Sequence, residues 1–307
     1  MALLARHRDK LPRWTPASPE LRALQQGVEI GRTLVGDKVR LTNRLTAALK
    51  NYSPQVVEWF AAKDTTIFCD FLTHWPPLSA VQQAPETALL TSFQIHKARY
   101  RKVNEQRLVQ IRPAHPLTEA PGVIRPNPLL VSTLVQQLKV VLDGSKQVDT
   151  AIPELFAPHQ DAALFRSLPG AGQQYAPRLL VAFGEDCARY ARTEDLLPYA
   201  GIAPVTERSG QTSWGHWRYS CPKFLRQSFV AWAEESIRHS FWASAFSRSH
   251  RVKGKSHQRA VRAVAFKWMR IVFRCWQTRK PYDEAKYLLA LKAKGSPLLT
   301  PFAPSSS

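Results

Sequence analysis

Apolar residues recur at helical spacing over a long stretch early in the chain. They follow mostly three-, four- and six-residue steps, which is the pattern of a helix with one apolar stripe. Ser18 is suited to cap this helix, and Pro19 fits its first turn. The pattern therefore predicts one long helix over residues 20–50. The stripe consists of Leu21, Leu24, Val28, Leu34, Val35, Leu41, Leu45 and Leu49.

The next segment is predicted to contain shorter helices, because Pro54, Pro76, Pro77 and Pro85 break residues 52–93. The shorter runs are followed by a basic stretch and then by a segment rich in proline.

The basic helical stretch spans residues 96–110 and places Lys97, Arg101 and Asn104 on one face. A contact with a polyanion and an ordinary solvated surface both fit this face. Five prolines in the segment that follows predict a loop at the tip of a hairpin, and helical spacing returns near Leu129. The sequence therefore predicts an antiparallel, coiled-coil-like helical pair. The returning stripe consists of Leu130, Leu134, Leu138, Val141 and Leu142.

A tight turn at Leu168–Gly172 introduces another helix, which Gly184 ends. Pro177 is best tolerated in a first turn, so the helix is expected to begin a few residues before it. This is the pattern of a helix–hairpin–helix element, in which Gly170 and Gly172 let the backbone approach a DNA phosphate. A hairpin that only packs against its neighbours fits the same pattern.

A serine on a turn stands out in residues 194–235. A short apolar helix ends at Gly201, a loop follows, and Ser209 precedes Gly210 with its hydroxyl open to solvent or substrate. A helix that starts at Pro222 comes next. Most Ser-Gly pairs are plain turns, but the charged neighbours here suit a hydroxyl that meets a phosphate. They are Glu207, the basic Arg208, His216, Arg218, Lys223 and Arg226, and the glutamates that close the helix.

The last third of the chain is its most basic part, with eleven Lys or Arg and no acid from Arg248 to Tyr282. Residues 256–279 read as one helix with an apolar core face, preceded by a basic loop that contains Lys253 and Lys255. The other face lacks the interspersed acids of an ordinary solvated surface, so it favours phosphate contact. The arginines of this face are Arg259, Arg262, Arg270 and Arg274.

Aromatic residues interleave with these basic groups, and they fit either stacking on bases or a small core. Phe229, Trp232 and Trp242 are expected in the core. Trp214 and Trp217 lie in the loop next to the serine and are better suited to stacking.

Composition and charge indicate which classes of binding partner the chain favours. A net charge of +20 and a pI of about 10.2 favour polyanions, above all nucleic acid, with a ribosome-associated or anionic-membrane protein as alternatives. No apolar run approaches membrane-spanning length, and no secretory signal is visible. The four cysteines are far apart without a CxxC pair, so a zinc site is not predicted and reduced thiols in a bacterial cytoplasm are the simplest reading.

Four motifs carry a resemblance to a known family. In chain order they are Leu168–Gly172, Phe183–Asp186, Leu197–Pro204 and Arg208–Gly210. They resemble the C-terminal domain of the insertion-sequence transposases related to the Piv and MooV DNA invertases, some of which are guided by a bridge RNA. The resemblance runs from about residue 2 to about residue 290.

The resemblance implies a chemistry. In the family, a serine attacks a DNA phosphodiester and forms a covalent phosphoserine, while a ribonuclease-H-like domain with four carboxylates holds magnesium. By match to the motif the nucleophile is Ser209, with Ser213 as the fallback. Those carboxylates precede the equivalent of Ala2, so the chain resembles an N-terminally truncated member and is expected to be inactive alone.

The sequence thus predicts a mainly α chain with a remnant and linker at 1–17 and a coiled-coil-like region at 18–160. A transposase domain at 161–295 and a loose tail complete it. DNA, in some members a bridge RNA, and further copies of the chain are the implied partners. Two functions stay open: a recombinase that uses Ser209, and a nucleic-acid-binding remnant without catalysis.

Overall fold

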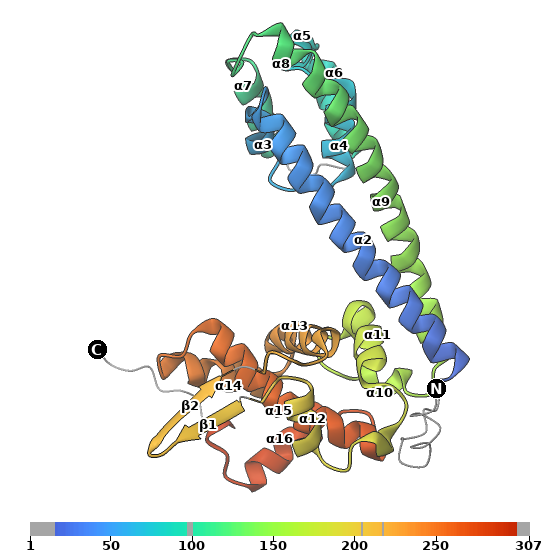
Figure 1. The fold of residues 1–307 in the computed structure, drawn as a ribbon, viewed down its shortest axis with the longest axis vertical. Helices are drawn as coiled ribbons and strands as arrows, with labels where there is room; N and C mark the ends of the chain where they lie inside the picture. Colours follow the sequence, from blue (N-terminus) through green and yellow to red (C-terminus); the bar gives the residue numbers. More distant parts are fainter. Residues whose placement is uncertain (1–15, 97–100, 204, 217, 300–307) are drawn as a thin grey trace, which may run out of the picture. The chain divides into compact units, whose positions relative to one another are not determined.

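The computed structural model describes residues 16–96, 101–203, 205–216 and 218–299. These residues form a mainly helical chain with one two-stranded sheet (Figure 1). They divide into two compact units. The arm unit is Glu29–Ala151, and the base unit joins the residues up to Val28 with those from Ile152 onward. The middle region predicted for residues 18–160 therefore contributes both of its ends to the base unit.

Two long helices, α2 (Pro19–Lys50) and α9 (Pro126–Phe156), dominate the arm unit and continue into the base unit. Within the arm unit they lie side by side and antiparallel (Figure 1). A Cβ on Gly144 of α9 would lie 3.8 Å from the Leu34 side chain of α2. The predicted helical pair is therefore present, although α9 begins three residues before the predicted Leu129.

Short helices fill the segment between α2 and α9. Pro54, Pro77 and Pro85 each stand directly before one of them, as the broken pattern predicted. The basic stretch expected as one helix at 96–110 is different, because one helix ends at Ile95 and the next begins at Arg101. These helices are α3 (Gln55–Trp59), α4 (Thr66–His74), α5 (Leu78–Gln83), α6 (Glu86–Ile95), α7 (Arg101–Ile111) and α8 (Pro121–Ile124).

The core of the arm unit corrects three side-chain predictions. Val35 and Leu130 are 53% and 45% exposed, and Val131 is buried in place of Leu130, whereas Leu134, Leu138 and Leu142 are buried as predicted. Asn104, predicted on a charged face, is buried, and its side-chain oxygen accepts a hydrogen bond from Arg107 at 3.1 Å. Lys97, from the same predicted face, lies outside the described residues.

The base unit contains the segments with the candidate chemistry. Its elements are α10 (Ala162–Arg166), α11 (Gly172–Phe183), the 3₁₀ turn η2 (Cys187–Arg189), α12 (Thr193–Tyr199), β1 (Val205–Ser209), β2 (Thr212–His216), α13 (Lys223–His239), α14 (Phe241–Val252), α15 (His257–Thr278), α16 (Glu284–Ala293) and η3 (Pro297–Leu299). Helix α15 matches its predicted bounds within one residue at each end. Helix α11 begins at Gly172, so that Pro177 is its sixth residue rather than part of its first turn.

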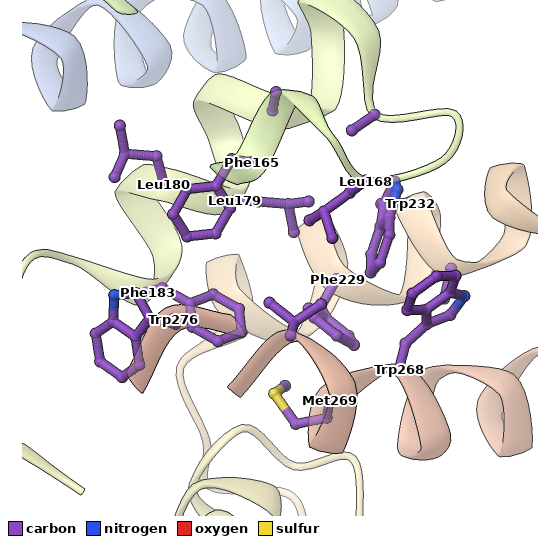
Figure 2. Packing of buried hydrophobic residues seen from close by; sticks show 14 of the residues in the cluster. Phe165, Leu168, Leu179, Leu180, Phe183, Phe229, Trp232, Trp268, Met269 and Trp276 are labelled. Carbon is purple, nitrogen blue, oxygen red and sulfur yellow. The ribbon is translucent and has the colours of Figure 1, made fainter. Parts of the chain in front are cut away.

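Four fully buried tryptophans, at positions 232, 242, 268 and 276, organise the core of this unit. Figure 2 shows three of them, Trp232, Trp268 and Trp276, among the apolar side chains of this core. Each indole N–H has a partner: Pro169 O at 3.0 Å, Tyr282 OH at 3.0 Å, Ser236 Oγ at 2.7 Å and Gly184 O at 3.1 Å, respectively. A buried tryptophan therefore carries no unsatisfied donor, which would cost about 1–3 kcal/mol. The core placement predicted for Phe229, Trp232 and Trp242 is confirmed.

A β-hairpin, β1–β2, occupies the segment where a loop and an aromatic run were predicted. Trp214 is 45% exposed on it, while Trp217 lies outside the described residues. The described helices include no candidate membrane span.

Candidate nucleic-acid interface and serine hairpin

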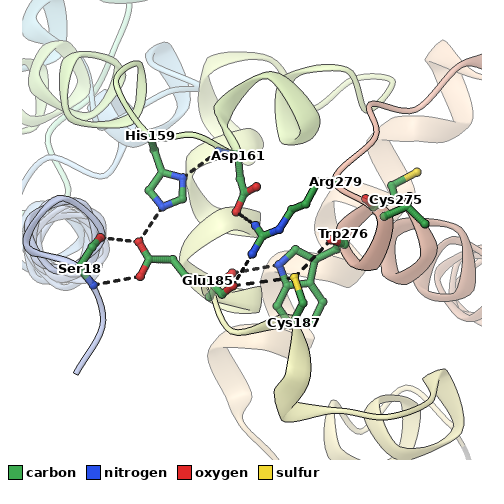
Figure 3. Close-up of polar contacts among 10 residues, drawn as sticks. Ser18, His159, Asp161, Glu185, Cys187, Cys275, Trp276 and Arg279 are labelled. Carbon is green, nitrogen blue, oxygen red and sulfur yellow. Dashed lines mark hydrogen bonds and ion pairs between the residues drawn. The ribbon is translucent and has the colours of Figure 1, made fainter. Parts of the chain in front are cut away.

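The second family-like motif, Phe183–Asp186, is explained by a polar network rather than by a reactive group (Figure 3). The Glu185 carboxylate accepts the Ser18 N–H at 2.9 Å, the Ser18 hydroxyl, and Nε2–H of buried His159 at 2.9 Å. Nδ1 of His159 accepts the Asp161 N–H at 3.0 Å, which assigns the proton to Nε2. Burial alone would raise the pKa of Glu185, but the bonds from Ser18 and His159 hold it below its ordinary value.

The same network also includes the end of α15. Arg279, at the end of α15, donates to the Asp161 carboxylate and to the Glu185 carbonyl at 2.6 Å. Ser18 also caps α2 by accepting the Leu21 N–H at 3.1 Å, as predicted. Glu185 therefore anchors the start of α2 to the loop after α11.

Two motif glycines are required by close packing. Gly201 has a φ of +67°, and a Cβ there would lie 2.6 Å from Cys221 Sγ. Gly170 has a φ of +71°, and a Cβ there would lie 2.7 Å from the ring of His239. The backbone of Gly170 thus faces α13, whereas Gly172 is exposed at the first position of α11 with nothing within 4 Å of a Cβ. The phosphate roles predicted for both glycines stay predictions, and the geometry suits Gly172 better.

Ser209 ends β1 at the tip of the hairpin, where it pairs with Thr212 across a two-residue turn. Gly210 has a φ of +58°, the conformation that the first turn position of a type II′ hairpin requires. Opposite residues of a ladder share a face and neighbours alternate, so Ser209 lies on one face, and Arg208 with Ser213 on the other. Both serines are exposed. The two candidate nucleophiles would therefore meet a substrate from opposite sides.

Some of the polar side chains near Ser209 contact one another rather than the serine. On the Ser209 face, Glu207 and His216 pair at 2.7 Å, and the His216 ring stacks on Tyr219 with centroids 6.0 Å apart. Among the described residues, no side chain makes a hydrogen bond to the Ser209 hydroxyl. The hairpin therefore presents the serine without a general base in contact with it.

The basic residues predicted around the hairpin and loop lie at separate places in the base unit. Lys223 is exposed at the first turn of α13, and half-buried Arg226 donates to the Arg218 carbonyl at 3.3 Å. Lys253 and Lys255 are exposed between α14 and α15.

The predicted arginines of α15 follow one helical stripe, since positions 259, 262, 270 and 274 recur at three-, four- and eight-residue steps. Arg259, Arg270 and Arg274 are exposed, and Arg262 is half-buried. Arg270 pairs with Glu194 of α12 at 2.9 Å. The buried stripe of the same helix, which includes Val261, Val264, Trp268 and Val272, points the opposite way into the core. The structure thus brings the four arginines to one face of one helix.

Carboxylates of the described residues do not assemble a metal site. Asp64 pairs with Lys38 at 2.9 Å, and Asp70 with Lys139 at 2.6 Å and His96 at 2.8 Å. In the described part of the chain, no group of three or more His, Cys, Asp or Glu is placed to hold a metal ion. These residues therefore do not fit the magnesium that the family resemblance implies.

Comparison with known proteins gives a family context. Residues 162–248, from α10 to α14, match the family model described as transposase IS116/IS110/IS902 family. The chain is 25% identical over 277 residues to the mini-circle putative transposase for IS117 of Streptomyces coelicolor, covering 88% of this chain and 67% of that protein.

Two further relatives match shorter parts of the chain. It is 31% identical over 170 residues to the insertion element IS900 uncharacterized 42 kDa protein of Mycobacterium paratuberculosis, covering 53% of this chain and 42% of that protein. It is 29% identical over 144 residues to the pilin gene-inverting protein of Moraxella bovis, covering 45% and 42%. The chain thus spans two thirds or less of the length of these relatives. The matched family segment contains the Ser209 hairpin and ends before α15.

Proposed function

We propose that this chain, which is related to the IS116/IS110/IS902 transposases through residues 162–248, binds DNA through α15 and presents Ser209 to a DNA phosphodiester. The observation that carries the proposal is the stripe of four arginines on α15, within a stretch that holds no acidic residue from Arg248 to Tyr282. A surface helix usually alternates charges of both signs, whereas a one-signed stripe attracts negative charge, as the pairing of Arg270 with the Glu194 carboxylate shows. DNA phosphates supply that charge, and the release of counterions drives the binding.

The α11 turn supports the same partner. The first N–H groups of a helix have no partner within the helix, and they attract anions. Gly172 opens α11 and is exposed, so its backbone is accessible to a phosphate oxygen. Gly170 keeps the turn close to α13 instead.

The reaction proposed for Ser209 follows from its exposure. The Ser209 hydroxyl loses its proton to solvent, its oxygen bonds to phosphorus, and the bond from phosphorus to one strand's oxygen breaks. That strand leaves as a hydroxyl after taking up a proton, and the other stays attached as a phosphoserine. A serine hydroxyl is weakly acidic, so without a base in contact the step is slow. No step is routed through magnesium, because the described carboxylates do not fit it.

A salt titration of DNA binding tests the first part of the proposal. Affinity for a labelled duplex should fall steeply with salt, by a slope near 0.9 for each phosphate contact. Replacing Arg259, Arg262, Arg270 and Arg274 together by Gln should weaken binding and lower that slope. The matched control replaces Arg22, Arg32, Arg40 and Arg44 of α2, so both variants lose four charges and reach a net charge of +16 (20 − 4). Equal effects of the two variants, or a flat salt response, would contradict binding through α15.

Covalent capture tests the second part. With an unmodified duplex and magnesium, we expect no adduct from the chain alone, because among the described residues no base contacts Ser209 and no group is placed to hold a metal ion. A duplex in which sulfur replaces the bridging oxygen releases a thiolate that needs no proton, so we expect an adduct with it. Ser209→Ala should abolish this adduct, and Ser213→Ala, on the opposite face, should keep it.

A second function, nucleic-acid binding without catalysis, is favoured by the isolation of the Ser209 hydroxyl from any described base. If the sulfur-containing duplex also yields no adduct while binding persists, this second function replaces the first. An adduct that survives Ser209→Ala refutes the choice of nucleophile.

A further inference from the structure

A groove of about 570 Å³ lies along α15, on the same face as the arginine stripe. Six of its nine lining residues come from α15 and recur at three- and four-residue steps. Phe246 and His250 of α14, together with Ile202, complete the lining. The α15 residues are Arg259, Arg262, Ala263, Phe266, Lys267 and Arg270.

The lining separates into cationic and apolar groups. Three arginines and Lys267 provide positive charge, whereas Phe246, Phe266, Ala263 and Ile202 provide apolar surface; the described lining contains no carboxylate. Lys267 Nζ lies 4.9 Å from the Trp242 ring centroid and 4.8 Å from that of Phe246, so ring faces hold it in place.

Two titratable groups of the groove, His250 and Arg262, have pKa values that are lowered by burial and by nearby positive charges. Burial, together with Lys253 and Lys255, lowers the pKa of His250. Burial, together with Arg259, lowers the pKa of Arg262. Burial is the larger cause of both shifts, and the neighbouring cations add to it, so a bound anion would favour the charged form of each group.

We propose that this groove takes one unpaired nucleotide of a DNA strand, with the base against Phe266 and the flanking phosphates against Arg259, Arg262 and Arg270. The proposal rests on the proposed function, because it assumes that α15 contacts DNA. It names what that surface recognises: a base outside the helical stack next to its own phosphates.

The mixture of apolar and cationic lining selects this occupant. A paired duplex presents phosphates and sugars on its outside, so it satisfies the arginines but leaves the Phe266 ring without a flat partner. A base out of the stack has an apolar face that stacks on an aromatic ring and carries its negative phosphates with it. The volume lies within the range of about 300–1,000 Å³ that is typical of small-ligand sites.

Fluorescence anisotropy with three labelled duplexes of one sequence tests this proposal. The first is fully paired, the second carries one extra unpaired nucleotide, and the third carries an extra abasic residue at that position. The full chain should bind the second about 5- to 150-fold more tightly than the other two, the range of one base stacked on an aromatic ring. Phe266→Ala should remove this preference and leave affinity for the paired duplex unchanged.

Two further variants keep the outcome decisive. Ala263→Leu fills the groove without removing a ring and should also abolish the preference, which covers the case in which Phe266→Ala fails to fold. Phe241→Ala removes a phenylalanine that is 54% exposed and does not line the groove, and it should keep the preference.

Equal affinity for the three duplexes overturns the proposal. If the abasic duplex binds as tightly as the duplex with the unpaired nucleotide, the proposal is also overturned, because flexibility of the DNA rather than the base would be recognised. Stronger binding of an RNA with the same unpaired base overturns the choice of DNA. Loss of binding to every duplex refutes the proposed function itself, a different result from loss of preference.

Discussion

Replacing Gly201 by alanine should destabilise the base unit at the point where the serine hairpin is attached. Gly201 stands just before β1 and Cys221 just after β2, so their contact closes the foot of the hairpin. A Cβ at Gly201 would lie 2.6 Å from Cys221 Sγ and 3.0 Å from Cys221 Cβ. The first of these distances is shorter than any ordinary carbon–sulfur contact, so the chain must shift.

Two terms set the magnitude. A φ of +67° costs an L-residue about 1–2 kcal/mol relative to glycine, and forcing an extra methyl into a packed site costs about 1–3 kcal/mol. The loss of freedom in the unfolded chain returns about 0.4–1 kcal/mol. The net loss in the free energy of unfolding should be about 1–5 kcal/mol, with a central value of about 3 kcal/mol.

Urea unfolding followed by tryptophan fluorescence measures this loss, because four tryptophans report on the base unit. Gly210→Ala is the matched control: its φ is +58° but nothing lies within 4 Å of a Cβ, so only about 1 kcal/mol should be lost. Adding Cys221→Ala to Gly201→Ala removes the sulfur and should recover at least about 1 kcal/mol in a double-mutant cycle. Equal losses at Gly201 and Gly210, or no recovery, would refute steric contact as the cause.

Two further predictions concern pH and assembly. Because hydrogen bonds hold the pKa of Glu185 below its unfolded value of about 4.3, its contribution to stability is present above that pH and is lost as the pH falls through the folded pKa. Glu185→Gln should therefore flatten the acid decline of the urea midpoint, and exposed Asp186→Asn should not; parallel declines would contradict the assignment. The paired α2 and α9 should join copies of the chain, so light scattering at micromolar concentration should show a dimer or larger, and a strict monomer would refute this. Val140 is 72% exposed and lines a groove between α2 and α9, so Val140→Asp should favour the monomer, whereas Val109→Asp on α7 should not.

The long helices were predictable because their signals repeat. The apolar stripe of α2 begins directly after a capping serine, and that of α15 continues through the whole helix. One wrongly assigned position has little effect on a stripe that extends over many turns. The helices α2 and α9 were therefore predicted correctly although Val35 and Leu130 are exposed. The arginine stripe of α15 was predictable for the same reason.

The hairpin was not predicted, because a strand reveals itself by burying every second residue and β1 and β2 bury almost none. The signal that remained was local: Ser209-Gly210 between β-branched residues such as Val205, Thr206 and Thr212. The Glu185 network carries no sequence signal, since Ser18, His159 and Arg279 lie far apart along the chain.

The groove along α15 could not be predicted from the sequence pattern of that helix alone. The stripe of arginines predicts a charged face, but the groove also needs Phe246 and His250, which belong to α14, and Ile202, so its lining depends on tertiary packing.

The tryptophan core also connects binding to the serine. Helix α13 is the next helix after the hairpin and packs on α11, α14 and α15, so it links the hairpin segment to the helix proposed to contact phosphates. Attack requires the serine oxygen to approach phosphorus within about 3–3.5 Å, and a misplacement of about 1 Å costs roughly a hundredfold in rate. A DNA duplex held by flexible side chains on α15 would not meet that tolerance unless the core between α13 and α15 were rigid. The satisfied indole N–H groups provide such rigidity, because each ties a buried ring to a fixed backbone or side-chain oxygen on another part of the unit. On the proposed function, binding on α15 would therefore determine where a phosphate meets the hairpin, and the two elements would contribute different chemistry.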